Sequence, residues 1–242
     1  MTTPPRVTIR NLTGTWIIDK SRTENLDAAL KLQGIGWLRR KAVSTGTITL
    51  KITQYSDPDP DSSTSTSPST SPPNTDTVKG EKAKAVRLMM QQGLRGIFPG
   101  VEQTRVLDWS EHGHVDAVSG AGIVIRSRFV DGIRIRNGDG DGQGTGMVKP
   151  EIQVQTVGAV DLSSVEGYLG GAVCLLNEDH GGGLERMFVQ DFIRCEEGGW
   201  TAEQVWAVEK VGEDVFLSCR AVAVKGSSLE KACLVYKYEE QQ

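Results

Sequence analysis

The sequence predicts a mainly β protein: an up-and-down antiparallel β-barrel of about ten strands with a short helix-turn-helix lid near the N-terminus. Two observations carry this prediction. About ten segments have strand-like patterns with turn residues between neighbours, and two short helical patterns follow the first strand. Closing hairpin-linked strands into a barrel leaves no unpaired edge, so a barrel is the natural arrangement.

The first predicted strand spans residues 6–18 and carries Gly-Thr-Trp at 14–16. Two short helices are expected next, separated by a turn at 33–34. Ser21 followed by Glu24 is typical of a helix start, because the hydroxyl accepts from an early backbone N–H and the carboxylate suits the positive end of the helix dipole. The helices are expected to share an apolar stripe formed by Leu26, Ala29, Leu30, Ile35 and Leu38.

Nine further strands are expected. In the first of them Ile48, Leu50 and Ile52 alternate with polar residues, which is typical of an antiparallel strand with one buried face. Glycine-containing turns separate the last four, as hairpins require. The nine predicted strands lie at residues 45–55, 83–92, 101–109, 115–119, 123–130, 185–195, 200–210, 214–225 and 229–239.

A single barrel domain covering residues 1–242 is expected, with two insertions. Residues 56–79 lack apolar side chains to bury and are rich in Ser, Thr and Pro, so this segment is expected to be disordered. Residues 131–183 form a second, irregular insertion. Its only regular structure is expected to be a short strand at 151–157 and a helical turn at 163–169.

The N-terminal segment resembles the intracellular fatty-acid-binding proteins, within the calycin superfamily. The Gly-Thr-Trp strand is followed by Thr-Glu-Asn-Leu-Asp at 23–27, Gly-Ile-Gly at 34–36 and a basic pair at 39–40. The match is close over about thirty residues, and beyond them it rests on strand layout and the closing Leu-Val-Tyr-Lys at 234–237. The layout also resembles fungal lipocalin-like and fatty-acid-binding-like proteins. The resemblance implies that the helix pair covers one mouth of a ten-strand barrel.

A barrel of about ten strands is too wide for its own side chains to fill, so a cavity that binds a hydrophobic small molecule is expected. In the fatty-acid-binding proteins an Arg-x-Tyr on the last strand and an arginine on the third-last strand hold the ligand carboxylate. Here Tyr236 takes the tyrosine position, Leu234 replaces one arginine, and Trp206 or Ala207 replaces the other. A bulkier, less charged ligand is therefore expected.

Strand alternation supplies the other candidates for the cavity wall. Basic side chains in mid-strand could pair with a polar group of the ligand if they point inward, and they could equally face water. Carboxylates at Asp108 and Glu203 could move protons in the cavity, but strand carboxylates usually face solvent, so no catalytic residue is assigned. The predicted ligand-binding residues are Trp16, Arg105, Arg126, Arg128, Gln204, Trp206, Arg220, Leu234 and Tyr236.

Composition argues against several partners. The net charge is −4, and no basic stripe indicates a nucleic-acid partner. No stretch is long and apolar enough to span a membrane, and no signal peptide is visible. The chain is expected to be a monomer. The scattered cysteines predict reduced, semi-buried thiols and a cytoplasmic location; they are Cys174, Cys195, Cys219 and Cys233.

No metal site or cofactor is predicted. The Asn-Gly-Asp-Gly-Asp-Gly run at 137–142 begins like a calcium loop, but Val148 stands where that loop needs a glutamate, so a flexible loop is the better interpretation. Glu111, His112, His114 and Asp116 could supply metal ligands, but they are expected in a solvated turn. The sequence contains no hydrolase or nucleotide-binding motif.

Three functions remain open from the sequence. The first is intracellular binding of a lipid, polyketide or terpenoid-like molecule. The second is a cofactor-free isomerase or cyclase of the pericyclase type in fungal secondary metabolism, a role known for calycin-like barrels that needs only a shaped cavity and one or two polarising donors. The third is an interaction scaffold that uses the two insertions.

Overall fold

The structure, a computed structural model, describes residues 7–56, 85–135, 145–148, 151, 153–154, 162–171, 173–175, 186–211 and 214–239. The segment expected to be disordered lies outside the described residues from residue 57 onward. The calcium-like run at 137–142 also lies outside them.

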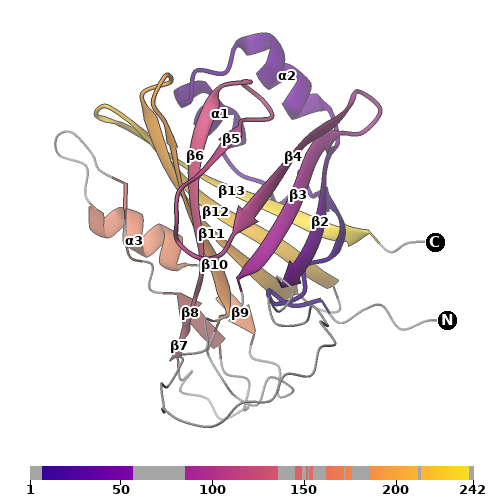
Figure 1. Cartoon of the computed structure of the whole chain (residues 1–242), viewed down its shortest axis with the longest axis vertical. Helices are drawn as coiled ribbons and strands as arrows, with labels where there is room; N and C mark the ends of the chain where they lie inside the picture. The colour runs from indigo at the N-terminus through magenta and orange to yellow at the C-terminus, as the bar shows by residue number, and fades with distance from the viewer. Residues whose placement is uncertain are drawn as a thin grey trace, which may run out of the picture.

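Ten antiparallel strands form one sheet that curls into a nearly closed barrel, which confirms the predicted fold class (Figure 1). The sheet order is β4-β3-β2-β1-β13-β12-β11-β10-β6-β5, so the chain ends meet where β1 pairs with β13. The strands are β1 (Gly14–Ile18), β2 (Ile48–Ser56), β3 (Val86–Leu94), β4 (Phe98–Val106), β5 (His112–Val115), β6 (Gly122–Val130), β10 (Phe188–Cys195), β11 (Trp200–Val211), β12 (Asp214–Lys225) and β13 (Ser228–Glu239).

The barrel is not fully hydrogen-bonded around its circumference. β4 and β5 are the two end strands of the sheet, and they contact each other without a ladder between them. The Gln103 amide bridges the gap by donating from Nε2 to the Val115 carbonyl at 2.9 Å. The closure between β4 and β5 therefore depends on side chains.

Two predicted strand positions are wrong. The first strand begins at Gly14, because Thr8 and Asn11 close a tight turn with backbone hydrogen bonds of 2.8 and 3.2 Å. Residues 112–115 form β5 instead of a turn, and the expected strand at 115–119 turns over Asp116. The Asp116 carboxylate accepts from the backbone N–H of Ser119 at 2.6 Å and so stabilises that turn.

The predicted lid is present as α1 (Leu26–Leu32) and α2 (Trp37–Thr45), which lie over one end of the barrel (Figure 1). Gly34 between them has a φ of +85°, which a residue with a side chain rarely adopts. α1 buries Ala29 and Leu30 and contacts β12 and β13. The predicted apolar stripe ends at Ile35, since Leu38 on α2 is 74% exposed.

The predicted start of α1 is wrong. Ser21 bonds to the Asp19 carboxylate and lies well before the helix, which begins after Asn25. The Asn25 side chain donates to the Lys231 carbonyl at 2.8 Å, and Glu24 exchanges backbone hydrogen bonds with Cys233. The first turn of the lid is thus attached to β13 instead of being capped by its own serine.

Steric crowding explains why the Gly-Thr-Trp strand begins with a glycine. Gly14 has a φ of +147°, and a Cβ there would lie 2.4 Å from the Tyr238 ring. That ring meets Trp16 edge-on, with centroids 5.1 Å apart. A side chain at position 14 would displace this aromatic pair from the wall of the barrel.

The barrel is packed on its outside as well as its inside. α3 (Leu162–Gly170) lies beside the outer surface of the sheet, and a small sheet of β7 (Gly132–Ile135), β8 (Thr145–Val148) and β9 (Val173–Leu175) lies at the end away from the lid (Figure 1). The helical turn expected at 163–169 is therefore a full helix, whereas 151 and 153–154 are not in a strand. Apolar residues of α3 pack against the outward side chains of β10 to β12, burying Val165, Leu169, Phe188, Val205 and Val222.

The described cysteines are free thiols. Cys195 and Cys219 are buried, and Cys233 is half-buried. Within the described residues, no helix has the length and apolar character that a membrane span requires.

Candidate functional site

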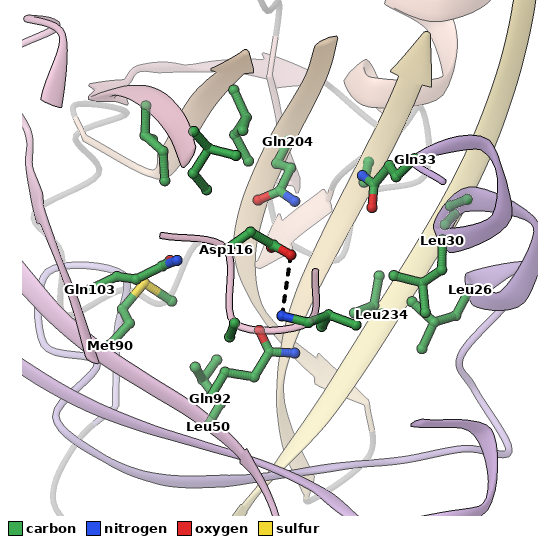
Figure 2. Close-up of a pocket in the computed structure, with 18 of the residues that line it drawn as sticks. Leu26, Leu30, Gln33, Leu50, Met90, Gln92, Gln103, Asp116, Gln204 and Leu234 are labelled. Atoms are coloured by element: carbon green, nitrogen blue, oxygen red, sulfur yellow. Dashed lines mark hydrogen bonds between the residues drawn. The ribbon is translucent and has the colours of Figure 1, made fainter. Parts of the chain in front are cut away.

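A cavity of about 140 Å³ lies inside the barrel under α1 (Figure 2). Leu26, Ala29 and Leu30 of the lid cover it, and the turn at 116–118 closes one side. Most of the residues that line it are apolar, and the inward positions of β6, β10 and β13 carry Ile123, Ile125, Ile193 and Leu234. Six polar side chains also reach the wall, namely Gln33, Gln92, Gln103, Arg105, Asp116 and Gln204.

Asp191 anchors a buried polar cluster beside the cavity. It is completely buried and forms an ion pair with Arg105, which is 8% exposed. Its carboxylate also accepts from Ser127 Oγ at 2.6 Å and from Trp206 Nε1 at 2.8 Å. The charge of Arg105 is thus offset within the protein, as a buried cation requires.

Trp206 links this cluster to the aromatic core. Its ring stacks on Tyr236 with centroids 6.3 Å apart, and the Arg105 guanidinium lies 5.6 Å from its ring centroid. Tyr236 is 1% exposed, and burial raises the pKa of its phenol well above the usual range. The tyrosine therefore stays neutral and acts as part of the packed wall.

Two residues of the cavity wall have a buried polar atom without a hydrogen-bond partner among the described residues: Arg105, at its Nε, and Gln204. In Gln204 this atom is the acceptor Oε1. Figure 2 shows its amide at the cavity. The Asp116 carboxylate, which also lines the cavity, already accepts from the Val118 backbone N–H at 3.2 Å. A buried acceptor without a donor is costly, so the cavity favours an occupant that supplies one.

His114 lies on the inward face of β5, since it pairs with Ile123 of β6. Its Nε2 is buried without a partner among the described residues. Burial lowers the pKa of this imidazole, and the positive charge of Arg105 lowers it further. The side chain is therefore a neutral base next to the Arg105–Asp191 pair, not a group in a solvated turn.

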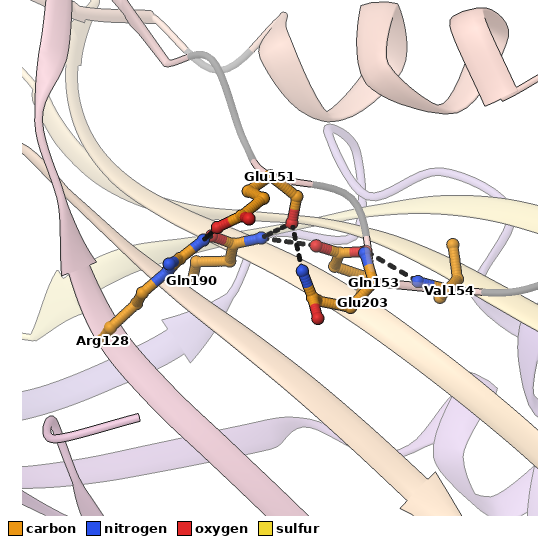
Figure 3. A network of polar contacts seen from close by, with 6 residues as sticks. All are labelled: Arg128, Glu151, Gln153, Val154, Gln190 and Glu203. Carbon is orange, nitrogen blue, oxygen red and sulfur yellow. Dashed lines mark hydrogen bonds and ion pairs between the residues drawn. The ribbon is translucent and has the colours of Figure 1, made fainter. Parts of the chain in front are cut away.

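A second polar network lies on the outer face of the barrel (Figure 3). Glu203 is completely buried and accepts from the backbone N–H groups of Gln153 at 2.8 Å and Val154 at 3.2 Å. Gln190 donates to Glu203 and to the Glu151 carbonyl. Burial raises the pKa of Glu203 despite these donors. Glu203 and Gln190 hold residues 151 and 153–154 against the sheet and take no part in the cavity.

The structure brings four of the nine predicted residues together at the cavity: Arg105, Gln204, Trp206 and Leu234. Trp16 and Tyr236 are in the packed core of the barrel instead.

The other three predicted residues are corrected, because they are on the outer face. Arg126 pairs with Glu111, and Arg128 pairs with Glu151 at 3.1 Å and lies over the Trp109 ring. Arg220 faces the Tyr168 ring of α3 at 5.7 Å. Their strands alternate as predicted, but the opposite set of side chains points inward.

No protein-family model matches this chain, and no curated protein matches it. A solved structure of a mutant of the fatty acid transporter REP1-NXSQ is similar to it, with 12% sequence identity and a TM-score of 0.38. The similarity covers 94% of this chain and 98% of the other. The fold described above rests on the strand pairing of this chain itself.

Asp191 is the main residue that the sequence analysis missed. Its signal was present, because it shares the alternating face of β10 with Val189 and Ile193, both of which are apolar. A single carboxylate within an apolar stripe indicates a buried, paired charge. The sequence indicated His114 only as a possible metal ligand, and it indicated Leu26 and Leu30 only as packing residues of the lid, not as part of the cavity wall.

The basic pair at 39–40 makes polar contacts that connect the two lid helices to each other and to the barrel. Arg40 of α2 pairs with Asp27 of α1. Arg39 donates from Nη1 to the carbonyls of Val118 at 3.0 Å and Ser119 at 2.7 Å, which connects α2 to the turn that closes the cavity. The basic pair therefore binds the lid to itself and to the β5–β6 turn.

Proposed function

We propose that this chain binds a small hydrophobic molecule inside its barrel. The observation that supports this most directly is the cavity of about 140 Å³, most of whose lining residues are apolar and to which six polar side chains also contribute. The proposal also includes membership of the calycin superfamily, a single barrel domain with two insertions, a monomeric state and a cytoplasmic location. The cytoplasmic location rests on the scattered cysteines.

The cavity volume limits the occupant. A void of about 140 Å³ is close to the ~150 Å³ of an engineered apolar cavity that takes up benzene. It is smaller than the roughly 300–1,000 Å³ of most ligand pockets. In the described conformation, the cavity therefore suits a molecule about the size of a substituted benzene ring.

A larger lipid, polyketide or terpenoid would need additional space. A second cavity of about 160 Å³ lies between α1, α2 and β2, and it shares Leu26 and Leu30 with the first as part of its wall. Movement of these two side chains would connect the cavities. α2 has no buried residue, so displacing it exposes little apolar surface.

Native mass spectrometry of the purified protein, followed by solvent extraction, tests the proposal. We expect a bound apolar molecule in the wild type. Ala221→Leu fills the cavity wall and should abolish occupancy, whereas Ala221→Ser keeps the volume and should preserve it. Equal occupancy in both variants would show that the molecule binds elsewhere.

A second candidate function is cofactor-free isomerisation or cyclisation of a hydrophobic intermediate, as in fungal secondary metabolism. The observation that favours it is His114, a neutral imidazole with a buried, unpartnered Nε2 next to the Arg105–Asp191 pair. Incubating the extracted compound with fresh protein and following it by mass spectrometry tests this function. His114→Gln should abolish conversion but preserve occupancy, and an unchanged compound with the wild type would refute catalysis.

A further inference from the structure

We propose that the cavity selects a neutral ligand that carries a hydrogen-bond donor, such as a hydroxyl or a primary amide, and that Gln204 Oε1 receives this donor. The proposal rests on the cavity-binding function proposed above and adds the chemical class of the ligand.

The argument begins with the charge balance of the wall. Arg105 lines the cavity, but Asp191 already neutralises it in an ion pair that also engages Ser127 and Trp206. A ligand carboxylate that approached Arg105 would also approach the buried Asp191 carboxylate, and like charges at short range repel strongly in a dry interior. The cavity therefore disfavours an anion.

The hydrogen-bond balance gives the second step. Gln103 donates to the Val115 carbonyl at 2.9 Å, and the Asp116 carboxylate accepts from its own turn. Gln204 Oε1, by contrast, is buried and lacks a donor among the described residues. An occupant with an O–H or N–H near Gln204 removes this deficit, and an occupant without one leaves it in place.

The apolar remainder of the wall gives the third step. Ile123, Ile125, Ile193 and Leu234 contact the rest of the cavity. A compact ring or branched hydrocarbon that carries one donor matches these side chains. A fatty acid carboxylate matches neither the charge nor the volume of the site.

Isothermal titration calorimetry with two size-matched pairs tests the proposal on the wild-type protein. Phenol and toluene have equal numbers of heavy atoms and differ in the hydroxyl. Benzamide and benzoate differ in charge. We expect phenol to bind at least about 5-fold more tightly than toluene, and benzamide at least about 10-fold more tightly than benzoate. Anisole, which accepts but cannot donate, should bind more weakly than phenol, because it leaves Gln204 Oε1 without a donor.

Gln204→Leu should remove the preference for phenol over toluene. Gln33→Leu, which removes an amide from the lid side of the same cavity, is the matched control and should keep the preference. Toluene or benzoate binding as tightly as its partner in the wild type would refute the proposed selectivity while leaving cavity binding intact. If none of the five probes binds, cavity binding by such molecules fails and the selectivity fails with it.

Discussion

Asp191 carries a charge inside the barrel, and three donors surround it. Removing one partner of such a pair leaves the other charged and buried, which typically costs more than the pair itself contributes. Arg105, Ser127 and Trp206 lie on three different strands, so this one carboxylate fixes the relative positions of β4, β6 and β11.

A double-mutant cycle measures this coupling. Arg105→Met and Asp191→Asn should each lower the free energy of unfolding by about 3–5 kcal/mol. Asparagine keeps an acceptor for Trp206, so the double variant should lose much less than the sum of the two. Urea denaturation gives all four values, and simple additivity would contradict the coupling.

Glu203 predicts a pH dependence of stability. Its folded pKa is raised by burial, so the folded state binds a proton more tightly than the unfolded chain does. The contribution of Glu203 to stability is therefore greatest at low pH and is lost as the pH rises above the ordinary glutamate pKa. Compared with Glu203→Gln, the wild type should lose stability as the pH rises from below the ordinary glutamate pKa toward neutral pH. Urea denaturation of both proteins across this range measures the difference, and a constant difference would contradict the assignment.

At the scale of single elements, the pairing of β4 with β3 depends on a glycine near the start of β4. Gly100 has a φ of +88°, and a Cβ there would lie 1.9 Å from the Gln92 carbonyl oxygen. The register shifts at this point, between Gln92 and Leu94. The irregular pairing brings the two backbones too close for any side chain at position 100.

Gly100→Ala should therefore lower the free energy of unfolding by roughly 2–4 kcal/mol. Gly113→Ala is the control, because a Cβ at position 113 meets nothing within 4 Å. This control should change the unfolding free energy by less than about 1 kcal/mol. Thermal or urea unfolding compares the two, and similar effects at both glycines would show that the close approach at Gly100 does not control stability.

The bounds of strands were predicted best where a strand pairs with the next strand in the sequence. The last four strands lie within a few residues of their predicted bounds, because tight turns and alternating apolar residues are local signals. β5 was missed, since its pattern around His112 and His114 is polar. α1 was found, but its anchor on β13 connects Asn25 to Lys231, far apart in the sequence.

At the scale of the whole molecule, the barrel has one weak seam. β4 and β5 end the sheet and have no ladder between them, whereas β12 is paired on both sides. Backbone amides of β4 and β5 that face the seam should exchange with deuterium at least about 100-fold faster than those in the middle of β12. Hydrogen exchange followed by NMR measures both, and equal protection would show that the barrel closes as firmly there as elsewhere.

The sequence by itself determined the antiparallel barrel of about ten strands, the positions of most of these strands, the helix pair near the N-terminus and the presence of polar side chains in mid-strand. Each of these depends on local geometry: a period of two in strands, a period near 3.6 in helices, and the backbone needs of turns. Strand alternation indicated Arg105, Gln204 and Trp206 at the cavity, whereas Leu234 was predicted from the resemblance to the fatty-acid-binding proteins.

Only the tertiary structure decided which face of each strand is inside. α3 and residues 151 and 153–154 cover the outer face of β10 to β12. Both faces of these strands are therefore buried, and the usual contrast between an apolar and a polar face disappears. Arg220 of β12 was consequently predicted on the wrong side, and Asp191 of β10 was missed. The partners that neutralise a buried charge lie on distant strands, and a local pattern carries no information about contacts between residues far apart in the sequence.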